Sequence, residues 1–282
     1  MANGIILVDK PMDWTSQDVV SKLRGVFHEK RIGHGGTLDP MATGVLPVFV
    51  GRATRGVEFF EHAEKIYEAT LRLGVVTDTQ DIWGNVLEEN AVPQGDISHI
   101  LPKFTGKIQQ IPPMYSAIKI GGKKLYELAR AGKEVQREPR EITIFSLEAQ
   151  QQSERDWLLR VHCSKGTYVR TLCHDIGRAL GCGGCMAALR RVQAGSYALS
   201  QCTPLADIIA CAEPETLLRP VEELFAQYPV LRLTAAQEKC VRNGAAFTCN
   251  VTGTYRVYGQ DGSFLALCQE KEGKLTTIKS FF

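Results

Sequence analysis

A lone carboxylate, Asp39, stands in a glycine-rich stretch that runs from Arg31 to Pro47 and also contains His34. Pro40 disfavours the helical conformation at Asp39 and pushes it toward extended backbone. Four glycines let the surrounding chain adopt positive φ or approach a ligand closely: Gly33, Gly35, Gly36 and Gly44. The sequence therefore predicts a carboxylate presented on a loop for chemistry, not one built into a helix.

Two other interpretations of this loop have to be weighed. A glycine-rich loop can cradle a phosphate, but here no Gly-Lys-Ser/Thr follows, and no G-x-G-x-x-G opens a helix after a strand. An Asp-Pro dipeptide can also be an ordinary surface turn in which the carboxylate bonds nearby backbone. The loop alone does not exclude the surface-turn interpretation. The choice between the interpretations depends on later segments of the chain.

Composition places the chain among ordinary soluble globular proteins. It has 282 residues, of which 44% are hydrophobic and 23% charged, enough for one large domain and a small one. No apolar run approaches the roughly 20 residues that span a bilayer. The nine cysteines are an odd number and no secretory pattern precedes them, which favours reduced thiols and a cytoplasmic protein.

Positive charge gathers in one segment, although the net charge is only +2. The stretch from Lys119 to Arg140 contains three glutamates and seven basic residues: Lys119, Lys123, Lys124, Arg130, Lys133, Arg137 and Arg140. A solvated charged helix would have this composition too. With the Gly121-Gly122 hinge, we favour an insertion at about 113–141 that binds a polyanion, which the family resemblance given below implies to be RNA.

The pair Cys182 and Cys185 has the spacing of metal ligands. A structural zinc site needs a second pair, and the sequence contains no other C-x-x-C and no H-x-x-x-H. We therefore expect small buried or half-buried thiols and no metal.

The first part of the chain has clear strand and helix patterns. Residues 4–9 and 45–50 are short apolar runs that predict buried strands. Thr15 and Asp18 form a capping-box pattern before a helix, and residues 52–62 are expected to be helical. Residues 65–73 alternate as a half-buried strand, with Tyr67 among the core-facing residues.

The later segments are mixed, and we divide the chain into a domain 1–228 and a small β domain 229–282. Thr167 is expected to cap a helix that runs to about Leu180 and carries Arg170 in its first turn. The other expected elements are an extended segment at 82–87, helices at 96–104 and 123–130, strands at 142–149, 157–163 and 189–192, and a more helical stretch at 204–227.

The Asp39 loop resembles the catalytic-aspartate motif of the TruB family of tRNA pseudouridine synthases. Two further segments match that family in the same order, Lys65-Ile-Tyr67 and the Lys-Gly-Thr-Tyr-Val-Arg run that ends at Arg170. Together with weaker matches they extend from residue 4 to about 200. The resemblance implies an α+β fold: a catalytic domain with a central mixed or antiparallel sheet flanked by helices, and a PUA-like C-terminal β domain.

The implied reaction isomerises uridine to pseudouridine in the T loop of tRNA, at position 55, without cofactor or catalytic metal. Asp39 would attack ribose C1′ or uracil C6, or would stabilise charge while a glycal-like species forms. Arg170 would hold this carboxylate by two charge-assisted bonds. Tyr67 would stack on the uracil, which must leave its own stack to reach any side chain.

The remaining expectations concern RNA. The candidate RNA-binding or base-pocket residues are His34, Lys10, Tyr168, Leu189, Arg31, Lys119, Lys123, Lys124 and Arg130. The expected partner is the T-arm stem-loop of tRNA, with no membrane and no obligatory protein partner. The alternatives are a catalytically silent RNA-binding or tRNA-chaperone protein on the same scaffold, a relative that modifies ribosomal or guide-selected RNA, and a nucleotide-binding enzyme.

Overall fold

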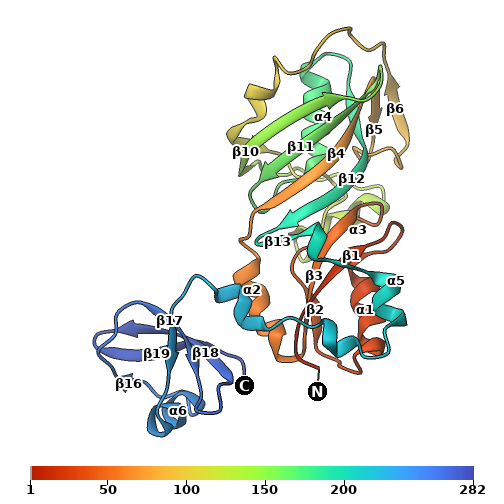
Figure 1. Ribbon diagram of the computed structural model, residues 1–282. Coiled ribbons are helices and arrows are strands. Elements are labelled where there is room, and N and C mark those ends of the chain that lie inside the picture. The colour runs from red at the N-terminus through yellow and green to blue at the C-terminus, as the bar shows by residue number, and fades with distance from the viewer. Residues whose placement is uncertain (1) are drawn as a thin grey trace.

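A ten-stranded mixed sheet forms the main body of the protein, whose computed structural model describes residues 2–282 (Figure 1). The strand order is β14-β1-β3-β12-β4-β11-β10-β7, with β2 beside β3 and β13 beside β12. The strands are β1 (Gly4–Lys10), β2 (Ile32–His34), β3 (Thr43–Val50), β4 (Lys65–Leu73), β7 (Gly106–Gln110), β10 (Arg140–Gln151), β11 (Asp156–Cys163), β12 (Gly184–Ala194), β13 (Tyr197–Ala198) and β14 (Thr203–Pro204). The predicted α+β class with a central mixed sheet is confirmed.

The two halves of this sheet meet at a short parallel seam between β3 and β12. Thr43 lies opposite Arg190, and Gly44 lies opposite Arg191. Gly44 has φ +101°, and a Cβ placed on it would stand 2.2 Å from the Arg191 carbonyl oxygen. Only glycine permits this approach of the two strands.

Burial explains why the strands differ in sequence pattern. β1 and β3 are buried on both faces, so their sequences are continuously apolar. Ile6, Val8, Leu46 and Val48 belong to one core, whereas Ile5, Leu7, Val45 and Phe49 belong to a second core on the opposite face. β4 instead alternates between buried and half-buried residues over its whole length, as predicted.

Helices cover the first core. The buried residues of α1 (Ser16–Val26), α4 (Val169–Ala179) and α5 (Leu205–Ala210) contribute to it. The predicted capping box at Thr15 and Asp18 is present. The other elements are α2 (Val57–Phe60), α3 (Leu125–Arg130), β5 (Val75–Thr77), β6 (Val86–Glu89), β8 (Lys119–Ile120), β9 (Lys123–Lys124) and 3₁₀ helices at Gly51–Gly56, Leu101–Phe104, Leu199–Gln201, Pro214–Leu217 and Val221–Phe225.

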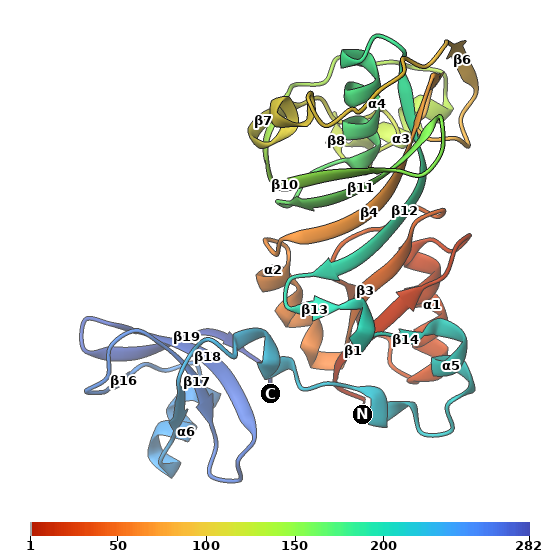
Figure 2. The same ribbon diagram turned by 45° about the horizontal axis from the view of Figure 1, so that its top comes forward.

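A second sheet of five strands lies beside α2 at the C-terminal end of the chain (Figures 1 and 2). It comprises β15 (Val230–Arg232), β16 (Phe247–Thr248), β17 (Thr254–Tyr258), β18 (Phe264–Lys271) and β19 (Lys274–Ser280), with α6 (Ala235–Arg242). Leu267 and Phe281 pack in the second core with Phe225, which joins this sheet to the main body. Its PUA-like identity and the boundary at 228/229 stay predictions.

Several predicted helices are shorter than expected. Residues 52–62 form a 3₁₀ helix and only one turn of α-helix, α2. Only Leu101–Phe104 is helical within 96–104, as a 3₁₀ turn with Pro102 in its first turn. In 204–227, α5 has six residues, and the two segments after it are 3₁₀ helices, one with Pro214 in its first turn and one directly after Pro220.

Two local predictions were wrong for hydrogen-bonding reasons. The Thr167 hydroxyl donates to the Ser164 carbonyl at 3.0 Å and is already used by the turn, so Tyr168 is the N-cap of α4, without a side-chain bond. Extended backbone in the 82–87 segment begins only at Val86, because residues before it form a turn around Asp81. Among residues 2–282, no helix combines the length and apolarity needed to cross a membrane.

Candidate active site

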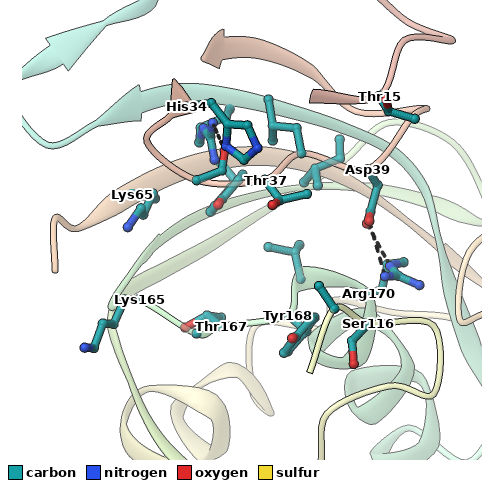
Figure 3. Close-up of a pocket in the computed structure, with 18 of the residues that line it drawn as sticks. Thr15, His34, Thr37, Asp39, Lys65, Ser116, Lys165, Thr167, Tyr168 and Arg170 are labelled. Atoms are coloured by element: carbon teal, nitrogen blue, oxygen red, sulfur yellow. Dashed lines mark hydrogen bonds and ion pairs between the residues drawn. The ribbon is translucent and has the colours of Figure 1, made fainter. Parts of the chain in front are cut away.

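A cavity of about 860 Å³ opens where the two halves of the main sheet meet (Figure 3). Its walls are the loop between β2 and β3, the β4 and β12 strands, the turn before α4 and the segment 115–117. The three residues for which a catalytic role is expected, Asp39, Tyr67 and Arg170, all line it.

The Asp39 loop is pinned from behind, which fixes where the carboxylate points. The Ser16 hydroxyl accepts from the Leu38 amide at 2.9 Å and donates to its carbonyl at 3.2 Å. The Lys10 ammonium donates to the Pro40 carbonyl at 3.1 Å. The Asp39 side chain itself is 34% exposed. The sequence expectation of a presented carboxylate therefore agrees with the structure.

Arg170, in the first turn of α4, holds this carboxylate with two nitrogens. Its Nε lies 3.0 Å from Asp39 Oδ2, and its Nη2 lies 3.4 Å from Oδ1. The guanidinium is only 6% exposed and also donates to the Tyr115 carbonyl at 2.7 Å and the Thr79 carbonyl at 3.1 Å. Such a fork fixes both the position and the orientation of the Asp39 carboxylate.

A second carboxylate, Asp81, lies behind Arg170, and no sequence pattern assigned it a role. Its Oδ2 is 3.7 Å from Arg170 Nη1, while its Oδ1 accepts from the Thr79 hydroxyl at 2.7 Å and from the Trp83 amide at 3.1 Å. Burial raises the pKa of Asp81, against the opposing effect of these bonds and of Arg170. One guanidinium thus lies between a buried carboxylate and an accessible one.

Tyr67 and Arg191 lie opposite each other on β4 and β12. Burial raises the pKa of Tyr67, so its hydroxyl keeps its proton at neutral pH. Arg191 is 1% exposed, and its guanidinium donates to the Val45 carbonyl at 2.7 Å and the Gly36 carbonyl at 3.1 Å. Arg191 therefore connects β12 to the Asp39 loop across the seam.

Lys10 does not face the cavity. It is fully buried, and its ammonium donates to three backbone carbonyls, those of Pro11, Trp14 and Pro40. Burial lowers its pKa to about 8. We expect Lys10 among the RNA-binding or base-pocket residues, but its contacts are those of a support for the Asp39 loop.

His34, Tyr168 and Leu189 do line the cavity. The side-chain amide of Gln110 bonds both the amide (2.8 Å) and the carbonyl (3.0 Å) of Tyr168 and so fixes its backbone. Burial, and then the charge of Arg191, lower the pKa of His34, which favours the neutral ring. The Nδ1 atom of His34 is buried without a hydrogen-bond partner among the described residues.

The basic residues separate into two groups. Arg130, at the end of α3, lines the cavity. Lys119, Lys123 and Lys124 lie outside it on the β8–β9 hairpin, where the first two are exposed. Arg31 is also exposed and outside the cavity lining, and its Nε lies 3.7 Å from Glu29.

The cysteines are all free thiols, five of them buried and four half-buried. Cys182 and Cys185 are both buried. Within the described part of the chain, no group of three or more histidine, cysteine or acidic side chains is placed to hold a metal ion.

Comparisons with known proteins identify the class of protein to which this chain belongs. The fold is similar to a solved structure reported as "Crystal Structure of a Cbf5-Nop10-Gar1 Complex", with a TM-score of 0.75 and 26% identity over 100% of this chain and 85% of that chain. Residues 24–169 match the model for the N-terminal domain of TruB family pseudouridylate synthases, and residues 170–226 match the tRNA pseudouridylate synthase B C-terminal domain. The fold is that of a pseudouridylate synthase.

Curated relatives narrow the class. The chain is 43% identical over 264 residues to tRNA pseudouridine synthase B of Dechloromonas aromatica (strain RCB), covering 92% of this chain and 88% of that protein. It is 39% identical over 287 residues to tRNA pseudouridine synthase B of Francisella philomiragia subsp. philomiragia, covering 99% and 95%. The chain belongs to the TruB family of pseudouridylate synthases.

Proposed function

We propose that the protein isomerises uridine to pseudouridine at position 55, in the T loop of tRNA, with Asp39 as the catalytic carboxylate. The observation that carries this proposal is the accessible Asp39 carboxylate, held by Arg170 at 3.0 Å at the wall of the cavity. The cavity volume of about 860 Å³ lies within the range of small-ligand sites, roughly 300–1,000 Å³.

The reaction needs no external reagent. The bond between uracil N1 and ribose C1′ breaks, the base turns, C5 bonds to C1′, and the proton lost from C5 is balanced by the one gained at N1. A carboxylate can attack C1′, attack C6, or stabilise positive charge on the sugar while a glycal-like species forms. In each route Arg170 has the same task, which is to keep the Asp39 oxygens aimed at the flipped nucleotide.

The rest of the cavity supports a flipped base. Tyr67 and Tyr168 supply aromatic faces, and Leu189 supplies apolar surface. Tyr67 and Leu189 lie at the edge of the core. Stacking of a base on an aromatic side chain is worth about 1–3 kcal/mol, which offsets part of the cost of leaving the RNA stack.

The choice of tRNA rests on the relatives, whose names state tRNA as the substrate. The T loop rests on the motif resemblance around Asp39, Tyr67 and Arg170. The basic insertion at about 113–141 would grip the T arm, with Arg130 reaching the cavity edge. The compartment would be the cytoplasm, where nine free thiols stay reduced.

An unmodified T-arm hairpin tests the proposal. The wild-type protein should convert the uridine equivalent to position 55 without additives, as shown by mapping pseudouridine. Asp39→Asn should bind the hairpin within a few-fold of wild type and form no pseudouridine, because the phosphate contacts persist while the carboxylate is absent. Asp13→Asn is the matched control, since Asp13 is exposed and outside the cavity lining.

Each failure points to a different error. Substantial product from the Asp39→Asn variant would sink the role of Asp39. Conversion of other uridines but not of the T-loop uridine would sink the choice of position. Tight binding by wild type without any product would favour the silent RNA-binding alternative.

A further inference from the structure

Three basic side chains gather at the end of the cavity away from Asp39 and Arg170. Figure 3 shows Lys65 and Lys165 together at that end, while the Asp39–Arg170 pair lies at the other. Arg191 lies in the wall beside them, and its charge and that of Lys165 both act on Lys65. Resting on the function proposed above, we propose that this end binds one phosphate of the RNA backbone next to the flipped nucleotide, through Lys65 and Lys165, with Arg191 adding charge behind them.

Two of these three cations are buried without a counter-ion. Lys65 is 8% exposed and Arg191 is 1% exposed. Within residues 2–282, neither of them nor Lys165 has a carboxylate at ion-pairing distance, even though Glu61 also lines the cavity. Taking a cation out of water costs several kcal/mol unless a partner compensates it. A bound phosphate would supply that partner.

The two lysine ammonium groups have spare hydrogen-bonding capacity. The Lys65 ammonium has three donors and makes one bond, to the Ala63 carbonyl. The Lys165 ammonium has only the His62 ring at 3.4 Å. Arg191 instead uses two of its nitrogens on backbone carbonyls and is fixed in place. Two lysine heads therefore have donors available for an anion, and Arg191 strengthens the field that attracts it.

The chemistry of the ligand follows from what RNA offers. Its only anionic group is the phosphodiester, and lysine binds phosphate as a point charge. Burial, followed by the positive charges of Arg191 and Lys165, lowers the pKa of Lys65 to about 8. A neighbouring phosphate would counteract this effect and keep Lys65 charged.

A phosphate-by-side-chain cycle tests the proposal. A series of T-arm hairpins is prepared, each with a neutral methylphosphonate at one linkage near the target uridine. The affinity of every hairpin is measured for wild type, Lys165→Met and Lys65→Met. In wild type, one linkage should weaken binding about tenfold when neutralised. Neutralising the same linkage should cost less in each variant than in wild type, because one of the two lysine partners is already absent.

Controls keep the test decisive. Lys22→Met, on the exposed face of α1, should retain the full effect at that linkage. Lys165→Arg should also retain it, since the charge persists. Lys165 is exposed, so its removal leaves folding intact, and the Lys165→Met variant tests the site independently of the buried Lys65. Additive effects in both variants, or equal effects at all linkages, would overturn the site.

Binding is the readout here, so the result separates this inference from the proposed function. A coupled linkage without pseudouridine formation by wild type would leave the phosphate site standing and remove the enzyme assignment. Pseudouridine formation by wild type, with no linkage whose effect depends on Lys65 or Lys165, would keep the enzyme assignment and remove the phosphate site.

Discussion

The two ends of the cavity differ in how their charges are balanced. At one end, Arg170 is bonded to Asp39 and to two backbone carbonyls, with Asp81 behind it. At the other end, Lys65 and Arg191 are buried, and the described residues offer them no ion-pair partner. The paired end is organised before RNA arrives, as chemistry requires. The unpaired end holds charge whose stabilisation depends on the substrate.

Removing the guanidinium should have the largest effect. Arg170→Met should lower the single-turnover rate by about 10²–10³-fold or more, because the Asp39 carboxylate loses its orientation. It should also destabilise the fold by about 3–5 kcal/mol, since the buried Asp81 is left without its cation. Rates with saturating hairpin and urea unfolding check both. Arg178→Met, on the same helix but exposed, is the control, and a near-normal rate for Arg170→Met would contradict the clamp.

Asp81→Asn should have a smaller effect at the same end. The amide can still accept from the Thr79 hydroxyl, but the negative charge 3.7 Å from Arg170 Nη1 is gone. We expect the single-turnover rate to fall about tenfold with unchanged hairpin affinity, a decrease of about 1.4 kcal/mol in transition-state stabilisation. Asp78→Asn, on the same turn but exposed, should keep its rate. A weakened affinity instead would place Asp81 in RNA binding.

The basic insertion extends the comparison to the cavity edge, where Arg130 lies, and to the surface outside it. Replacing Lys123, Lys124 and Arg130 by glutamine should weaken hairpin binding and flatten its dependence on salt. Every lysine or arginine that no longer neutralises a phosphate lowers the slope of log affinity against log salt by about 0.7–0.9. Affinities measured at several salt concentrations give that slope. If it stays unchanged, the insertion does not contact RNA.

Lys65→Met should stabilise the free protein, because it removes a buried charge from the unpaired end of the cavity. Burial lowers the pKa of Lys65 to about 8 from the usual 10.5. Below pH 8 the buried ammonium is charged, and this charge lowers the stability of the folded state. Between about pH 8 and 10.5 the folded state releases this proton while the unfolded chain keeps it, so the wild-type penalty shrinks as pH rises. The variant should be more stable than wild type by about 1–3 kcal/mol at pH 7, with the difference disappearing by about pH 10.

Urea unfolding of both proteins across this pH range measures that difference, and Lys22→Met, which changes an exposed lysine, should show none. A drop in stability at pH 7 in Lys65→Met would mean that the lysine already has a partner in the free protein.

Local patterns predicted the parts of this site that depend on local structure. The loop around Asp39 is encoded by its own glycines and proline, and the alternation of β4 predicts that Tyr67 faces inward. Asp81 could not be found this way, because its role arises only where a turn approaches Arg170, 89 residues later. Arg191 carried a weaker signal, since it lies on a strand with the buried Leu189.

The helix predictions failed for a related reason. The patterns over 52–62 and 96–104 suggested regular helices, but tertiary packing and Pro102 left short 3₁₀ segments. Thr167 was expected to cap α4, but its hydroxyl donates to the Ser164 carbonyl in the preceding turn and not to the helix. Such competition is decided by three-dimensional neighbours, which a single sequence does not reveal.

The seam at Gly44 has a consequence for how the protein fails on heating. Asp39 belongs to one half of the main sheet and Arg170 follows strands of the other. In the described residues, the β3–β12 ladder has two residue pairs, supplemented by the bond from Arg191 to the Val45 carbonyl. A slight opening there would separate the two partners while nearly all hydrogen bonds within each half survive. On heating, enzyme activity should therefore be lost at a lower temperature than the unfolding transition seen by circular dichroism. Activity assays should detect the first opening of the seam before any change in secondary structure.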